Sequence, residues 1–353
     1  MKKHEYYIKR CLHLAQKGIG TTRPNPSVGA VVVCDNKIIG EGFTSPYGGC
    51  HAEVNAINSV VDKALLIKAT IYVTLEPCAH FGKTPPCADL IVKHKIPNVV
   101  IGCIDTNSQV AGKGVERLLA AGCKVVVGVL ENECLEQHKR FFSVQNKNRP
   151  YIILKWAETQ DGFIAPLKKE KNRPVWISNA SSLQLVHKWR SEEHAILVGT
   201  ETAIADNPKL DVRNWGGKNP LRVVLDQNLR IPLSYSLFDE SVKTIVLTKM
   251  ENAKKKKASE NLIYKGVDFS RNIATQICEI LHQENIQSII IEGGRQTLQT
   301  FIDANLWDEV RVFVGAVYFN EGILAPKFEG ELSDEKNIKG TKLYIYKNRK
   351  NLS

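Results

Sequence analysis

The sequence contains no long apolar run. None of its apolar stretches reaches about 18 residues, so we expect neither a transmembrane helix nor a membrane partner. The opening residues Met1–Glu5 are not followed by the apolar core of about 7–15 residues that a signal peptide requires, so we expect a cytoplasmic protein. Internal repeats and low-complexity segments are also absent, which excludes a repeat array and a low-complexity linker protein.

Cysteine is nearly missing from the second half of the chain. Eight of the nine cysteines lie before residue 135, and only Cys278 follows. An odd number of cysteines in a long chain without a leader argues against a disulfide framework and favours a reducing compartment, where a few thiols serve as metal ligands. The asymmetry suggests that the two halves carry different chemistry. The cysteines expected to be packed core thiols are Cys11, Cys34, Cys103, Cys123 and Cys134.

The remaining composition is that of a folded protein with more than one domain. The 353 residues are 43% hydrophobic and 24% charged, which is enough apolar material for a core, and the length suggests two domains. The formal net charge of +11 is spread over both halves rather than gathered in a tail. A basic balance of this size fits a nucleic-acid partner, a small anionic substrate or a bland basic surface, and charge alone does not choose among them.

Helix and strand patterns alternate along the first half. The predicted strands are 30–34, 37–41, 69–75, 98–104 and 124–129. The predicted helices are 4–17, 52–61, 88–95, 113–121 and 131–142. Such alternation is typical of a mostly parallel sheet that helices cover on both faces, and ligands of such sheets bind at the carboxyl ends of the strands.

A polar segment separates the first half from the second. Residues 143–150 (SVQNKNRP) show no clear period, so we place a linker there and set the domains at 1–146 and 147–353. The second half is predicted to be another α/β domain with its own core. Its expected strands are 151–155, 195–199, 221–226, 244–248, 288–292 and 309–316. The charged run 251–257 (ENAKKKK) is expected to be a solvated helix or loop.

Three residues of the first half have the pattern of a zinc site. His51 enters a predicted helix, and Cys78 and Cys87 follow the strand at 69–75. One imidazole and two thiolates are the protein ligands of a catalytic zinc and leave the fourth position for water, whose proton Glu53 is placed to carry. The order H-x-E then P-C-x-x-C is a zinc nucleobase deaminase signature, but here eight residues separate the cysteines instead of two. A structural zinc with His80 or Cys50 as fourth ligand stays an alternative.

Five short motifs occur in a fixed order along the chain. They are NPSVG at 25–29, HAE at 51–53, TLEPC at 74–78, KTPPC at 83–87 and VAGKG at 110–114. Together they resemble the RibD family of bifunctional riboflavin biosynthesis proteins, in which the eight-residue cysteine spacing is the usual form. The resemblance covers essentially the whole chain. It implies an α/β fold with two domains, a cytidine-deaminase-like α/β/α domain and a dihydrofolate-reductase-like α/β domain.

The resemblance implies that the first domain deaminates 2,5-diamino-6-(5-phosphoribosylamino)pyrimidin-4(3H)-one with one Zn2+ per chain. His51, Cys78 and Cys87 match the zinc ligands of the family, and Glu53 matches its proton shuttle. The positions that hold the substrate are matched by Asn25, Lys83, Asp105 and Asn107. The chain departs from some members at Thr44, where they have a histidine.

The second half contains a glycine turn suited to a phosphate. A predicted strand runs into Glu292-Gly293-Gly294-Arg295 and then a helix, so backbone N–H groups would meet the phosphate, and Arg295 favours NADPH over NADH. The resemblance implies NADPH-dependent reduction of the ribosyl group. The implied cofactor contacts are Ala157, Trp176, Thr202, Asp206, Gly293, Gly294 and Arg295. The implied substrate contacts are Arg190, Leu210, Arg213 and Glu292.

Some details of the second half stay open at this point. Lys155, Asp206 and Glu292 are all candidates for the proton path of the reduction, and the sequence does not rank them. The chain departs from the family pattern at Pro174, where the family has a small polar segment, and at Gln227, where a serine is common.

Two other interpretations use the same residues. An RNA-editing adenosine deaminase shares HAE and the two thiolates, but the cysteine spacing and the long second half disfavour it. A structural zinc module beside a degenerate nucleotide-binding domain would not need Glu53. We therefore expect a small phosphorylated pyrimidine as the partner and no nucleic acid. A homo-oligomer is left open.

Overall fold

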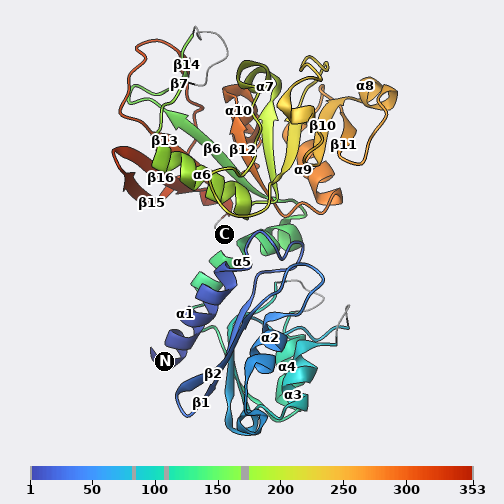
Figure 1. Ribbon diagram of the computed structural model, residues 1–353, viewed down its shortest axis with the longest axis vertical. Coiled ribbons are helices and arrows are strands. Elements are labelled where there is room, and N and C mark those ends of the chain that lie inside the picture. Colours follow the sequence, from blue (N-terminus) through green and yellow to red (C-terminus); the bar gives the residue numbers. More distant parts are fainter. Residues whose placement is uncertain (1, 82–84, 107–110, 168–174, 352–353) are drawn as a thin grey trace. The chain divides into compact units, whose positions relative to one another are not determined.

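The chain divides into two compact units, Met1–Asn148 and Arg149–Ser353 (Figure 1). This computed structural model describes residues 2–81, 85–106, 111–167 and 175–351. Among the helices of these residues, none combines the length and the hydropathy that a bilayer span requires.

The first unit alternates helices and strands as the sequence predicts. Its strands are β1 (Gly29–Cys34), β2 (Lys37–Phe43), β3 (Thr70–Leu75), β4 (Asn98–Cys103) and β5 (Lys124–Val127). Its helices are α1 (Lys2–Gln16), α2 (Ala52–Ser59), the 3-10 helix η1 (Lys63–Lys68), α3 (Cys87–Lys93), α4 (Lys113–Ala120) and α5 (Glu131–Lys147).

The sheet of the first unit has the strand order β2-β1-β3-β4-β5. β3, β4 and β5 pair in parallel, but β1 pairs antiparallel with both β2 and β3, so the expectation of a mostly parallel sheet is wrong for half of the pairings. The physical reason is the turn at Asp35-Asn36, where both residues have a positive φ, as in the tight turns that join antiparallel strands. That turn returns β2 directly beside β1.

Two layers of helices cover this sheet. α1 and α5 pack on one face, and α2, α3 and α4 pack on the other (Figure 1). Apolar side chains of both layers and of the sheet form one continuous core. Cys11, Cys34, Cys103 and Cys134 are buried in it as predicted, and Cys123 is partly buried at its border.

The boundary between the two units lies inside the predicted linker at 143–150. The expectation that this segment lacks helical structure is wrong, because α5 continues through it to Lys147. The buried positions of α5 are Cys134, His138, Phe142 and Ser143, which follow helical spacing and face the core. Two of these four side chains are polar, so hydrophobicity alone conceals the period. The change of unit occurs at Asn148, which ends the helix in the left-handed conformation with φ 51°.

The second unit is built on a larger sheet. Its strands are β6 (Tyr151–Glu158), β7 (Phe163–Ala165), β8 (Ala195–Gly199), β9 (Leu221–Leu225), β10 (Thr244–Lys249), β11 (Leu262–Val267), β12 (Ser288–Gly293), β13 (Glu309–Val314), β14 (Ile323–Leu324), β15 (Glu331–Ile338) and β16 (Thr341–Lys347). Its helices are α6 (Ala180–Glu192), α7 (Thr200–Asp206), α8 (Met250–Lys255), α9 (Ile273–Gln283) and α10 (Arg295–Asp303), with 3-10 helices η2 (Ser236–Phe238) and η3 (Arg349–Asn351).

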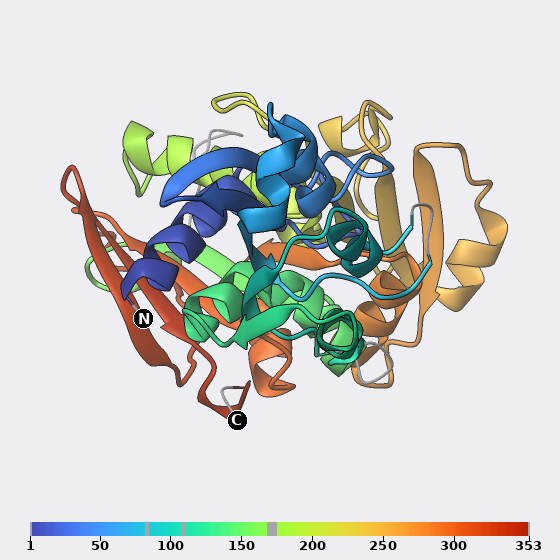
Figure 2. The ribbon, with the colours of Figure 1, turned by 90° about the horizontal axis from the view of Figure 1, so that it is seen from below.

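The main sheet of this unit has the order β11-β10-β9-β8-β12-β6-β13-β16-β15. Its strands are parallel from β11 to β13, and the hairpin β15–β16 adds two antiparallel strands. Figure 2 shows this red hairpin at one edge of the sheet and the orange β11–α8 segment at the other. α8 contains most of the charged run and has no buried residue, as the sequence predicts.

Core clusters lie on both faces of the main sheet. α9 and α10 pack on one face, where Ile277, Leu281, Leu298 and Phe301 are buried. α6 covers part of the other face with Val186 and Trp189, and α7 lies beside it over β8 and β9. The carboxyl ends of the parallel strands are thereby left for a site.

The buried imidazole of His138 should make the first unit acid-sensitive. Burial lowers the pKa of His138 to about 3, and its Nε2 lies 3.1 Å from Thr74 Oγ1, whose oxygen accepts from the Gly29 N–H. Because the folded pKa is below the unfolded value of about 6.5, the stabilising contribution is complete above pH 6.5 and is lost as the pH falls toward 3.

Through His138, the first unit should lose about 2 kcal/mol of unfolding free energy between pH 7 and pH 5. We predict that the His138→Gln variant does not show this loss. Amide hydrogen exchange in β3 and β4 measures this loss. Tryptophan fluorescence is the internal control, because all five tryptophans lie in the second unit. It should report the same unfolding of the second unit in the unmodified chain and in the His138→Gln variant. Equal acid sensitivity of β3 and β4 in both chains would contradict the prediction.

Candidate active sites

His51, Cys78 and Cys87 form one cluster in the first unit. Their ligand atoms all lie within 4.8 Å of one another, with His51 Nδ1 at 3.7 Å from Cys78 Sγ and 3.3 Å from Cys87 Sγ. Tetrahedral zinc with ordinary Zn–S and Zn–N distances requires an N···S separation of about 3.6 Å. The three side chains therefore fit a zinc ion. Among the described residues, neither Cys50 nor His80 joins this group.

The local structure explains how the three ligands meet. His51 is the N-cap of α2, but its ring makes no cap hydrogen bond and is turned to the two thiols instead. Cys87 opens α3, and its N–H donates to Cys78 Sγ over 3.3 Å. The N–H of Ala88 donates to the Cys78 carbonyl over 3.2 Å, so the start of α3 holds the turn that carries Cys78.

The two thiols have opposite tendencies. The pKa of Cys78 falls to about 4, because the Cys87 side chain donates to its sulfur and His51 adds a second favourable contact, against the effect of burial. Conversely, donation to Cys78 and burial raise the pKa of Cys87. A hydrogen bond to Cys78 also raises the pKa of His51. The cluster thus stabilises a thiolate, which is the form that binds zinc.

Glu53 lies beside this cluster in the first turn of α2. Its side chain is buried with 4% exposure. Burial and the nearby Cys78 raise the pKa of the carboxyl group to about 7, while a hydrogen bond with the Cys87 side chain acts in the opposite direction. A carboxyl group in this environment can take up and release a proton close to neutral pH.

Strand pairing places further predicted residues at the same edge of the sheet. Leu75 pairs with Cys103 at the ends of β3 and β4, and Gly29 at the start of β1 pairs with Phe43 at the end of β2. Asp105 follows β4, and Asn25 precedes β1, so both belong to the edge that carries the cluster.

The other residues discussed for this site have simpler outcomes. Thr44 is buried, and its backbone and side chain both bond to Val28, so that position is used for packing. Lys83 and Asn107 lie outside the described residues.

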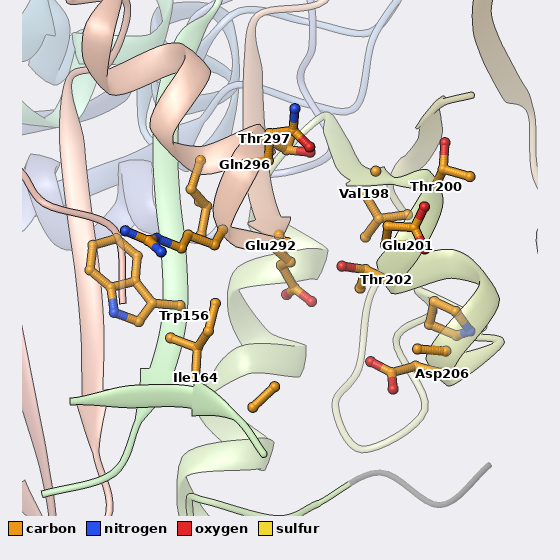
Figure 3. Close-up of a pocket in the computed structure, with 18 of the residues that line it drawn as sticks. Trp156, Ile164, Val198, Thr200, Glu201, Thr202, Asp206, Glu292, Gln296 and Thr297 are labelled. Atoms are coloured by element: carbon orange, nitrogen blue, oxygen red, sulfur yellow. The ribbon is translucent and has the colours of Figure 1, made fainter. Parts of the chain in front are cut away.

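A cleft of about 1400 Å³ occupies the second unit at the carboxyl ends of its parallel strands. All of the residues predicted for the cofactor and the second substrate line it: Ala157, Trp176, Arg190, Thr202, Asp206, Leu210, Arg213, Glu292, Gly293, Gly294 and Arg295. Figure 3 shows Glu292, Thr202 and Asp206 in this cleft, with Gln296 and Thr297 from the start of α10 beside them. The departing residue Gln227 also lines it, whereas Pro174 lies outside the described residues.

A buried ion pair stands at the base of this cleft. Arg190 of α6 donates to Glu292 at the end of β12 through Nη2 at 2.8 Å and Nε at 3.3 Å. Although burial opposes it, the charges of Arg190 and Lys155 hold the pKa of Glu292 at about 2. Burial and Arg190 lower the pKa of Lys155, and Glu292 partly offsets them. Arg190 of α6, Glu292 near the end of β12 and Lys155 of the neighbouring strand β6 thereby form one group of mixed charge.

Sequence reasoning missed His187, which supports this arrangement from the same helix. His187 Nδ1 donates to the Asp211 carbonyl over 2.9 Å, and Arg190 Nη1 donates to the same oxygen over 3.2 Å. Both donors hold the loop that carries Leu210 and Arg213. The sequence signal is the i, i+3 spacing of His187 and Arg190 on one face of α6.

Comparison with known proteins agrees with both sites. Residues 1–103 match the cytidine and deoxycytidylate deaminase zinc-binding region, and residues 150–344 match the RibD C-terminal domain. The chain is 43% identical to a riboflavin biosynthesis protein RibD of Aquifex aeolicus over 90% of this chain and 88% of that protein. For the Escherichia coli RibD the identity is 33%, over 88% and 87%.

Solved structures give the same result. A diaminohydroxyphosphoribosylaminopyrimidine deaminase/5-amino-6-(5-phosphoribosylamino)uracil reductase of Thermotoga maritima superimposes with a TM-score of 0.89 at 35% identity, covering 98% of this chain and 99% of that one. The RibD of Acinetobacter baumannii gives a TM-score of 0.86 at 31% identity, with the same coverage.

The fold and the sites define a bifunctional enzyme, with a zinc-binding deaminase domain followed by a dihydrofolate-reductase-like reductase domain. The chain belongs to the RibD family of riboflavin biosynthesis deaminase/reductases. The predicted family and fold class are therefore confirmed. This assignment favours a riboflavin biosynthesis deaminase/reductase over an RNA deaminase and over a structural zinc module.

The Arg190–Glu292 pair generates a stability prediction. Arg190→Leu removes the ion-pair partner of the largely buried Glu292 carboxylate and leaves Lys155 and His187 beside it, so we expect the second unit to lose about 3 kcal/mol of unfolding free energy. Arg213→Leu is the control, because the Arg213 side chain is about half exposed and its pair with Asp211 should contribute about 0–1 kcal/mol. Urea unfolding followed by tryptophan fluorescence measures both variants. Equal losses of unfolding free energy in the two variants would show that the buried pair contributes no more than the exposed pair.

Proposed function

We propose that the chain converts 2,5-diamino-6-(5-phosphoribosylamino)pyrimidin-4(3H)-one in two steps. The first unit removes the 2-amino group hydrolytically, and the second unit reduces the ribosyl group with NADPH to give 5-amino-6-(5-phosphoribitylamino)uracil. The observation that carries the proposal is the group of three zinc-type ligands with the buried Glu53 beside it, joined in one chain to the lined cleft of the second unit. The name of the Thermotoga maritima relative, a deaminase and a reductase of these pyrimidines, supports both reactions.

The first unit supplies ligands and a proton carrier. Zinc, when bound, makes water a nucleophile at neutral pH. His51, Cys78 and Cys87 would hold the metal with a fourth position open. Glu53 would accept the proton of the attacking water and deliver it to the departing ammonia, because it is the buried carboxyl group beside the three ligands. Asn25 and Asp105 would contact the substrate from the neighbouring strand ends, together with Lys83 and Asn107.

The second unit supplies a helix N-terminus for the cofactor phosphates and charged side chains for the substrate. NADPH, when bound, supplies the hydride. Gly294 is the N-cap of α10, so the first N–H groups of that helix are placed to meet a pyrophosphate, with Arg295 as a cation beside them. Ala157, Trp176, Thr202, Asp206 and Gly293 would complete the cofactor site. Arg190, Leu210, Arg213 and Glu292 would orient the substrate, and Lys155 is a second cation, after Arg190, whose charge acts on the carboxylate of Glu292.

Glu53→Gln should abolish deamination and retain zinc. We expect the rate of deamination to fall by at least about 10²–10⁴-fold, because the proton carrier is lost while the three ligands remain. Elemental analysis should find one zinc atom per chain in both forms, and reduction of the already deaminated substrate should continue with NADPH. Normal deamination by this variant, or an active chain without zinc, would contradict the assignment.

Gly294→Ala tests the cofactor cradle. The φ of −73° at Gly294 suits alanine, and the added Cβ would lie 3.1 Å from Thr202 Oγ1, so the Thr202 side chain must move by a few tenths of an ångström to accept it. If the pyrophosphate lies against the N–H groups here, NADPH affinity should fall by about tenfold to several hundredfold, since each charge-assisted hydrogen bond contributes about 1.5–3 kcal/mol. Deamination should not change.

Arg295→Ala separates the two phosphate sites. Loss of affinity for NADPH but not for NADH would place Arg295 at the 2′-phosphate, and equal loss would place it at the pyrophosphate. Unchanged NADPH binding in both Gly294→Ala and Arg295→Ala would show that Glu292–Arg295 is only a tight turn.

A further inference from the structure

The TLEPC and VAGKG motifs meet in the fold through the side chain of Glu76. Glu76 directly follows β3, and its side chain is buried. Its backbone N–H continues the parallel ladder by donating to the Cys103 carbonyl over 3.0 Å. The described residues of the VAGKG motif, 111–114, lead into α4 and form its first two residues. The proposed function uses neither Glu76 nor the glycines of this second motif.

The Glu76 carboxylate accepts hydrogen bonds from four backbone N–H groups of the described residues. Oε1 accepts from Gly114 at 2.8 Å and from Val115 at 3.2 Å. Oε2 accepts from Gly112 at 3.0 Å and from Asp105 at 3.3 Å. An ionised carboxylate offers about four lone-pair sites, and its burial is tolerated only when such partners compensate the lost water.

Three of these donors belong to the start of α4. Gly112 is the N-cap of α4 and has no side chain to accept from the first turn, while Gly114 and Val115 stand where an N-cap side chain usually binds. Glu76 takes this role from the neighbouring strand, and a negative charge is favourable at a helix N-terminus. Position 114 must be glycine, because a Cβ there would lie 2.1 Å from the Pro77 carbonyl oxygen.

The fourth donor, the N–H of Asp105, lies at the other end of the same loop. One carboxylate therefore fixes where the loop leaves β4 and where it enters α4. Two residues after Glu76 the chain reaches Cys78, one of the three zinc-type ligands. We propose that Glu76 is a positioning residue of the deaminase site, which sets the loop beginning at Asp105 relative to the turn that carries Cys78. This inference rests on the proposed function.

Glu76→Gln in the full-length, zinc-loaded chain tests the proposal. An amide has one accepting oxygen, and its NH2 group would face N–H donors that it cannot accept from. We expect the KM for the diaminopyrimidine to rise about tenfold or more, with a smaller change in the kcat of deamination. Zinc content and reduction of the deaminated substrate should stay at the level of the unmodified chain. Amide hydrogen exchange at Asp105, Gly112 and Val115 should accelerate.

Two further variants make the result specific. Glu116→Gln is the matched control, because it removes an exposed carboxylate from the first turn of the same helix, and its KM and exchange rates should match the unmodified chain. Glu76→Asp keeps the charge but is one methylene shorter, so its KM should lie between those of the unmodified chain and Glu76→Gln. It also replaces Glu76→Gln in the comparison if that variant does not fold.

Several outcomes would overturn the proposal. Unchanged KM and exchange in Glu76→Gln would mean that the four hydrogen bonds do not position the loop. Loss of zinc, or failure of both Glu76 variants to fold, would assign Glu76 to the metal site or to stability alone. If the unmodified chain and Glu116→Gln bind zinc but leave the pyrimidine intact, the proposed function itself fails, and the positioning role falls with it. The exchange rates still report the network independently in that case.

Discussion

A carboxylate that is buried at the end of a central strand must find compensating partners, because desolvation of an unpaired charge costs several kcal/mol. In the first unit this carboxylate is Glu76 after β3, and its partners are backbone N–H groups of the segment that follows β4. In the second unit it is Glu292 in β12, and its partner is the guanidinium of Arg190 in α6. Each pairing holds a segment from a distant part of the sequence at the carboxyl end of the sheet, where the site residues lie. The loops of both sites depend on these pairings, since loop sequences alone fix few backbone contacts.

The two sites use different residue types, which explains the uneven distribution of cysteine. Metal ligation in the first unit needs thiolates, and Cys78 after β3 and Cys87 at the start of α3 supply two of them beside His51. The other cysteines of this unit, apart from exposed Cys50, fill core positions or their border, as small apolar residues do. Under the proposed function, the second unit would bind its ligands through glycine, arginine and lysine at its strand ends, a site that needs no thiol. Its single cysteine, Cys278, is buried in α9 on one face of the sheet.

Short-range signals in the sequence were sufficient to predict the strands and the main helices of the first unit, six strands of the second unit and the zinc-type cluster. Those features depend on local hydrophobic period and on residues close to strand ends. The failures arise where polar residues are buried or where pairing is decided at long range. α5 continues past residue 142 because Ser143 faces the core, and the hairpin β15–β16 was missed because most of β15 is exposed and polar. The role of Glu76 was not predictable, because its partners are backbone N–H groups that carry no side-chain signal and lie 29 to 39 positions later.

Two arginine–carboxylate pairs of the second unit differ in how readily they can open to bind a phosphate. Arg190 is already neutralised by Glu292, and three of its five N–H groups are used on Glu292 and the Asp211 carbonyl. Arg213 is paired with Asp211 on its own loop, and the Arg213 side chain is about half exposed. Exchange of an exposed pair for a phosphate costs about 0–1 kcal/mol, whereas breaking the buried pair costs about 3 kcal/mol or more. Under the proposed function, Arg213 is therefore the arginine that changes partner when the phosphorylated substrate binds. Arg190 can offer the phosphate only its remaining N–H groups. If it gave up the bonds to Glu292, the Glu292 carboxylate would be left as an uncompensated charge.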